Sequence, residues 1–245
     1  MGNHDGAWGD TTSGYYYKQL PLEVVYNLIY RKQAMDLRRV SGDNGTYYYI
    51  DNVPQKMRYI MLNTNNTPNY EENADGTAKF DRFHSSCLGQ TQLDWLTNIA
   101  LNMPDGYTAC IFGHEPYVGD YSQLVGIVDA YNNKGAFKDS FTDSANTWRN
   151  STVNVNFASA KGEIAGVFAG HTHIDLIRHT GNNPMYSTCP LIITPNSLGG
   201  EVRDGTTRTD GTNTEFAMDI VTVDTKNRKI YMTRLGAGID REVSY

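Results

Sequence analysis

The sequence predicts a mixed α/β protein in which sheets lie between helices. Two apolar runs, residues 107–112 and 164–169, each end at a glycine followed by a histidine. They read as buried strands. Helical patterns alternate with strand patterns in the first part of the chain, which is the rhythm of a layered α/β sheet. From about residue 174 the chain becomes richer in short strands. The 245 residues show no internal repeat and no clear linker, so we expect one domain over residues 1–245.

The first half of the chain predicts two helices and two strands. Pro21 suits the first turn of a helix, and the apolar residues after it recur near helical spacing. Pro104 and Gly106 end the second helix. The predicted elements are, in order, a helix over residues 21–36, adjacent strands over 46–50 and 57–62, a polar surface loop over 69–86 and a helix over 90–102.

The second half predicts mostly strands. The elements are a strand over residues 107–112, a helix over 123–131, a strand over 164–169, and short strands over 174–178, 185–188, 191–193, 216–223 and 229–235. Residues 136–160 are weakly patterned and are assigned no element. Asp219, Thr222 and Asp224 alternate with apolar neighbours, as in a half-buried antiparallel hairpin.

Composition excludes several classes of protein. The formal net charge of −6 argues against a nucleic-acid binder held by a basic surface. No apolar run approaches the roughly 18 residues that a membrane-spanning helix needs, and no signal peptide is visible at the N-terminus. The cysteines are odd in number and far apart, so they predict neither a paired metal motif nor a disulfide framework. Cys110 lies in an apolar run and is expected in the core.

Glycines followed by histidines occur three times. Gly2 precedes Asn3, His4 and Asp5; Gly113 precedes His114; and Gly170 precedes His171 and His173. Ligands of open α/β sheets bind beyond the carboxyl ends of the strands. Neutral imidazole is a common metal ligand, and an amide oxygen suits harder cations. A His-x-His pair alone does not separate a metal site from a structural turn. The repetition favours one metal-centred site.

These motifs resemble the last three signature motifs of the calcineurin-like metallophosphoesterases. The resemblance rests on residues 2–5, 113–114 and 170–173, with support from 88–90 ahead of the second of these motifs. It extends from residue 2 to about residue 197. The resemblance implies a two-sheet β-sandwich flanked by helices and a dinuclear metal centre. It also implies hydrolysis of phosphomonoesters or phosphodiesters by a metal-activated water.

The resemblance assigns a role to each motif residue. By position, Asn3, His114 and His171 would bind one metal ion and His173 would bind the other. His4 would stabilise the transition state or protonate the leaving group, and Asp5 would orient His4. The ions would be divalent; the ligand types do not distinguish manganese, iron, zinc and nickel.

Two earlier motifs of that family, an Asp-x-His and a Gly-Asp pair, have no counterpart in this chain. Those motifs supply the carboxylates, including the one that bridges the metals. All the candidate ligands that remain are neutral, and charge in a desolvated site is costly unless it is paired. We therefore expect at most weak binding, or binding of a single metal ion. Asp10, Glu115 and Asp120 are carboxylates near these motifs in the sequence.

The absent motifs also bear on the fold. They predict an N-terminally incomplete domain, truncated or partial, with an exposed sheet edge. A second copy of the chain is one way of covering that edge, so self-association is an expectation. The resemblance implies a phosphate-ester substrate, and the acidic balance gives no support to nucleic acid as a partner.

The sequence supports two functional hypotheses. The first is a metal-dependent phosphoesterase whose activity is impaired in this chain. The second is a non-catalytic binding or structural module with a phosphoesterase-like fold, and the absent carboxylates are the observation behind it. A serine hydrolase is a poorer hypothesis, because the chain has no Gly-x-Ser-x-Gly turn and no clear triad.

Overall fold

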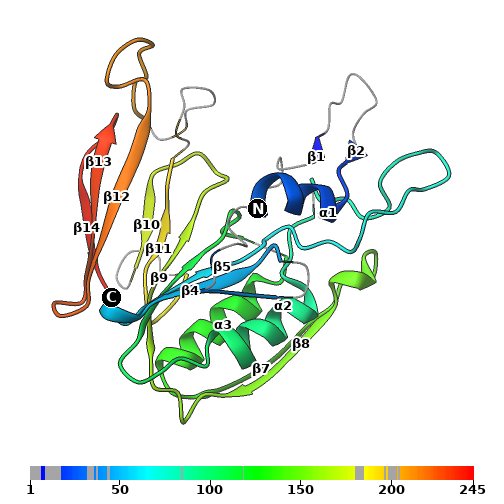
Figure 1. Cartoon of the computed structure of the whole chain (residues 1–245), viewed down its shortest axis with the longest axis horizontal. Helices are drawn as coiled ribbons and strands as arrows, with labels where there is room; N and C mark the ends of the chain where they lie inside the picture. Colours follow the sequence, from blue (N-terminus) through cyan, green and yellow to red (C-terminus); the bar gives the residue numbers. More distant parts are fainter. Residues whose placement is uncertain are drawn as a thin grey trace.

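The protein is described by a computed structural model. The described residues are 7–8, 18–31, 36, 38–42, 45–83, 85–117, 119–179, 185–195, 197, 203 and 205–245. They form a mixed α/β structure with one large sheet and few helices (Figure 1). None of the described helices is long and apolar enough to cross a membrane.

The large sheet is at the centre of the molecule. Its strands are β3 (Arg39–Ser41), β4 (Tyr48–Asn52), β5 (Met57–Met61), β6 (Thr108–Phe112), β9 (Glu163–Ala169), β10 (Leu176–Arg178) and β11 (Leu191–Ile193). They lie in the order β10-β11-β9-β6-β5-β4-β3. The inner strands β11, β9, β6 and β5 are mutually parallel. The outer strands pair antiparallel.

Helices cover one face of the large sheet (Figure 1). Helix α2 (Gly89–Trp95) continues into a π-helical turn (Leu96–Ala100) and connects β5 to β6. Helix α3 (Tyr121–Asn132) follows β6. Leu93 and Ile127 of these helices are buried against Ile111 of β6 in one apolar cluster. The continuous apolar runs of β6 and β9 follow from this position, because parallel strands are covered on both faces.

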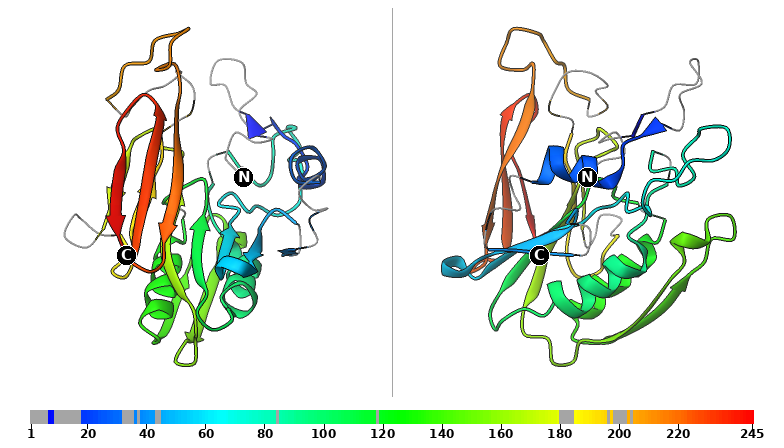
Figure 2. Two further views of the ribbon diagram at one scale, coloured as in Figure 1. Left: turned by 60° about the vertical axis from the view of Figure 1, so that its left-hand side comes forward. Right: turned by 45° about the vertical axis from the view of Figure 1, so that its right-hand side comes forward.

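A smaller, second sheet packs on the opposite face of the large sheet (Figure 2). It contains β12 (Ala217–Asp224), β13 (Lys229–Gly236) and β14 (Arg241–Ser244), all antiparallel. Ile230 and Met232 of β13 pack with Cys110 of β6 and Phe168 of β9. Cys110 is therefore in the core as predicted, and burial raises the pKa of its thiol to about 12.

Most predicted elements of the first half are present, with changed ends. The predicted strands over 46–50 and 57–62 correspond to the antiparallel pair β4 and β5, joined by a 3-10 turn (Val53–Gln55). Within the predicted helix over 21–36, the described residues form α1 (Leu22–Val25) and a π-helical turn (Tyr26–Tyr30), and residues 32–35 lie outside the described part of the chain. The structure adds β3 and a pairing of β1 (Ala7–Trp8) with β2 (Lys18–Gln19).

The weakly patterned stretch 136–160 is a β-hairpin. Strands β7 (Ala136–Phe141) and β8 (Ser151–Asn156) pair antiparallel around a 3-10 turn (Thr147–Arg149). Val153 of β8 is buried in the cluster under the helices, while its neighbours Thr152 and Asn154 are exposed. The alternation of buried and exposed residues is short, and many of the residues are polar. For this reason the sequence pattern did not distinguish the hairpin from a loop.

Two interpretations of the last third are corrected. Residues 185–188 form bends and not a strand, and β14 was not predicted. The hairpin β12–β13 is antiparallel as expected. However, Asp219 faces inward with its side chain 3% exposed, whereas Met218 is 52% exposed. The inward position of Asp219 is possible because arginine side chains pair with it.

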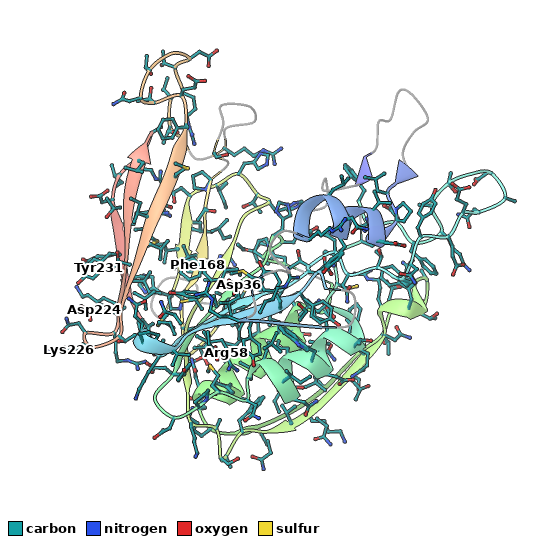
Figure 3. All side chains as sticks on the ribbon, in the orientation of Figure 1. Asp36, Arg58, Phe168, Asp224, Lys226 and Tyr231 are labelled. Atoms are coloured by element: carbon teal, nitrogen blue, oxygen red, sulfur yellow. The ribbon has the colours of Figure 1, made fainter. Side chains whose placement is uncertain are left out.

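Side chains at two places illustrate the layers (Figure 3). Arg58 lies on the helical side of the large sheet, where it donates hydrogen bonds to the carbonyls of Ala100 and Asn102. Asp224 and Lys226 lie at the turn between β12 and β13, at the far end of the second sheet from its β13–β14 connection. Strand β12 is an edge of the second sheet. Self-association across a sheet edge stays a prediction.

Candidate metal site at the strand ends

The turns after β6 and β9 bring two of the predicted histidines together. His114 follows β6 and Gly113, and His171 follows β9 and Gly170. Because β6 and β9 are neighbouring parallel strands, their carboxyl ends lie side by side. Nδ1 of His171 lies 3.3 Å from Nε2 of His114. The two rings meet edge to face, with centroids 5.1 Å apart.

Backbone hydrogen bonds join the two turns. The amide of Gly113 donates to the carbonyl of Phe168 at 2.9 Å, and the amide of Gly170 donates to the carbonyl of His114 at 2.9 Å. Gly113 has a steric reason to be glycine, because a Cβ there would lie 2.8 Å from Cγ2 of Thr64. The backbone hydrogen bonding between β6 and β9 thus continues beyond the ends of these strands as far as the two histidines.

The second turn has an uncommon backbone conformation. The φ angles are 65° at His171 and 58° at His173, in the left-handed region. Residues other than glycine enter this region infrequently. The amide of Thr172 donates to the carbonyl of Gly170 at 2.7 Å, and the carbonyl of His173 accepts from the amide of Arg203 at 3.2 Å. Strained backbone of this kind gathers at functional sites and persists where the surroundings hold it.

The spacing of the two ring nitrogens fits one metal ion. Two metal–nitrogen bonds of about 2.1 Å at a tetrahedral angle place the nitrogens about 3.4 Å apart. The observed 3.3 Å between His114 and His171 is close to that value. The same distance also allows a long N–H···N hydrogen bond between neutral rings. Among the described residues, no group of three or more His, Cys, Asp or Glu side chains is arranged to hold a metal.

The two carboxylates that follow His114 in the sequence, Glu115 and Asp120, have other partners. Glu115 accepts a hydrogen bond from Nδ2 of Asn65 at 2.6 Å. Asp120 is buried and accepts from the amides of Leu88 and Gly89 at the start of α2. Burial raises the pKa of Asp120 above its ordinary value, and these backbone hydrogen bonds oppose that shift. Asp120 thus serves the helix and not the histidine pair.

Several predicted site residues lie outside the described part of the chain. They are Asn3, His4, Asp5 and Asp10. His173 is described and lies in the same turn as His171. The structure therefore brings together His114 and His171, with His173 nearby in the chain.

Two polar neighbours of the site were not singled out from the sequence. Oγ1 of Thr64 accepts from the amide of Glu115 at 3.1 Å, and Asn65 binds the carboxylate of the same residue. Both are buried. Their signal in the sequence is their position shortly after strand β5, at the same end of the sheet as His114.

Comparison with known proteins adds no relative. No family model matches the chain, and no curated protein matches it.

Proposed function

We propose that the protein is a metal-dependent phosphoesterase of the metallophosphatase-like class, acting on phosphomonoesters or phosphodiesters. One observation carries this proposal, namely the approach of His114 and His171 to 3.3 Å at the ends of parallel neighbouring strands. The layers agree with it, because two sheets pack face to face and helices cover the outer face of the larger one.

The proposed site residues have two roles: some would bind the metal ion, and others would act on the substrate. His114 and His171 would hold a divalent ion, and the resemblance adds Asn3 and His173 to the ligands. A bound divalent ion lowers the pKa of water and offsets charge on phosphoryl oxygens. His4, oriented by Asp5, would donate a proton to the leaving group.

The charge balance predicts weak metal binding. All the proposed ligands are neutral. Glu115 and Asp120 are hydrogen-bonded to an amide side chain and to backbone amides respectively. Because a desolvated ion is stabilised only when its charge is offset, we expect a single ion bound weakly and slow turnover.

A metal titration tests the proposal. Calorimetry of the whole chain with Zn²⁺ or Mn²⁺ should show one weakly bound ion, and His114→Ala should weaken that binding about tenfold or more. His179→Ala is the matched control, since His179 follows β10 and lies outside the pair. Hydrolysis of an aryl phosphate monoester and of the corresponding diester, with and without metal, then tests turnover. Equal metal binding by the wild type and His114→Ala would contradict the proposal.

A non-catalytic module is the second candidate. The observation that favours it is the engagement of the nearby described carboxylates, Glu115 and Asp120, in structural hydrogen bonds. In that case the histidine pair is an N–H···N contact that closes the strand ends. Absence of metal binding together with absence of hydrolysis of either ester would favour this candidate over the enzyme.

A further inference from the structure

Four charged side chains form a closed network beside the second histidine turn. Arg234 donates to Asp175 at 2.7 Å and to Asp219 at 2.8 Å. Arg241 pairs with the same two aspartates. Each arginine therefore bridges both aspartates, and the network is neutral overall.

The network joins the second sheet to the turn after β9. Asp219 is on β12, Arg234 on β13 and Arg241 on β14. Asp175 is the member from outside that sheet, and it lies two residues after His173. The backbone of the turn is thereby fastened to a layer formed far along the chain.

The side chains of the network are largely buried, so their charges must be compensated by well-defined hydrogen bonds. The side chains are 1% exposed for Arg234, 3% for Asp219, 12% for Arg241 and 14% for Asp175. Charges this poorly solvated are tolerated only when good geometry compensates their desolvation. The planar guanidinium holds its partners in a fixed fork, so the carboxylate of Asp175 has little freedom to move. The guanidinium of Arg234 also donates to the carbonyl of Ala237, and the backbone amide of Arg234 donates to the carboxylate of Asp240.

The turn that Asp175 anchors is the one with the unusual backbone. His171 and His173 both have left-handed φ angles, and such residues need surroundings that hold them. Within the turn, the Thr172 amide supplies one hydrogen bond. Asp175 supplies the charged attachment that follows directly after the second histidine.

We propose that Asp175 is a positioning residue, which fixes the His171–His173 turn through the buried arginine pair of the second sheet. In its absence the turn relaxes and the imidazole of His171 leaves that of His114. The functional importance of this role rests on the proposed metal site. The positional claim itself does not.

The test needs variants that keep the buried charges balanced. Asp175→Ala combined with Arg241→Gln removes the acceptor at position 175 and leaves Arg234 paired with Asp219, so the network stays neutral while the turn is released. Asp175→Glu keeps all charges and moves the carboxylate by one methylene, and it covers the case in which the double variant does not fold. Asp51→Asn is the control for a general loss of stability, because it breaks another ion pair away from the turn, in which the side chain of Arg58 is 3% exposed and that of Asp51 is 21% exposed.

The readouts are structural first and functional second. Amide–Hα couplings of His171 and His173 report their φ angles, and a ring-to-ring NOE reports the contact of His114 with His171. We expect the couplings to change and the NOE to weaken in both Asp175 variants and to persist in Asp51→Asn. Zn²⁺ affinity should fall about tenfold in the double variant.

The outcomes separate the two proposals. Unchanged couplings and NOE in a folded Asp175 variant overturn the positioning role, as does an equal change in Asp51→Asn. If the wild type binds no Zn²⁺, the proposed metal site fails, while the NMR comparison still decides the role of Asp175.

Discussion

The turn that carries His114 is held by hydrogen bonds to neighbouring loops and to the start of α2, whereas the turn that carries His171 is attached by charges to the second sheet. At the first turn, Thr64 and Asn65 bind Glu115, and Asp120 binds the start of α2. At the second, Asp175 enters a buried network with two arginines.

The difference predicts how much stability the protein loses when a single interaction is removed at each turn. A single hydrogen bond contributes about 1 kcal/mol net, so the first turn should lose stability in small steps. Removing one member of a buried ion network leaves an uncompensated charge, so a single substitution at the second turn should cause a large loss of stability. Four changes test this contrast, given from the largest expected effect to the smallest.

Arg234→Met should cause the largest loss. It leaves Asp175 and Asp219 with one arginine, and a buried charge left unpaired costs about 3–5 kcal/mol. Urea denaturation followed by circular dichroism measures the free energy of unfolding. Arg228→Met is the control, because Arg228 pairs with Glu163 at the surface and its side chain is 52% exposed. Similar losses for the two variants would remove the contrast between buried and exposed charge.

Asp120→Ala should cost less than Arg234→Met. It leaves the buried amides of Leu88 and Gly89 without their acceptor. Unsatisfied buried donors cost about 1–3 kcal/mol. The same denaturation measurement applies, with Asp94→Ala on the exposed side of α2 as control. A loss as large as that of Arg234→Met would show that the first turn is no more tolerant than the second.

Gly113→Ala should destabilise the folded protein through a single steric clash. The added Cβ would meet Cγ2 of Thr64 at 2.8 Å, and overpacking of this kind costs about 1–3 kcal/mol. Thr64→Ser removes that methyl group and keeps the hydroxyl that Glu115 uses. The double variant should therefore recover most of the loss, and purely additive losses would reject the steric explanation.

The pH dependence of Asp120 should give the smallest effect. Burial raises its folded pKa above the ordinary 3.8, so the folded protein keeps a proton that the unfolded chain has released. The unfolding free energy therefore falls as pH rises from about the unfolded pKa through the folded one. Asp120→Asn does not titrate, so the wild type should lose stability relative to this variant over that window. A pH-independent difference in melting temperature between the two would contradict the assignment.

Local sequence patterns were sufficient to predict the inner strands of the large sheet and the proximity of two histidines. β6 and β9 are continuous apolar runs because they are buried on both faces. Strands that connect through helices lie parallel, and His114 and His171 follow the ends of two such strands. The hairpin over β7 and β8 escaped prediction, because its polar residues outnumber the apolar ones that reveal its alternation.

By itself, the sequence determined which strands are buried and which residues stand at their ends, because burial and turn formation act over a few neighbouring residues. The tertiary structure alone decided that Asp175 meets Arg234 and Arg241, which are 59 and 66 residues away. It also decided that Asp219 faces inward and that Asp120 serves α2. A charged side chain carries no local signal of its partner, because the partner is chosen by which layers pack together.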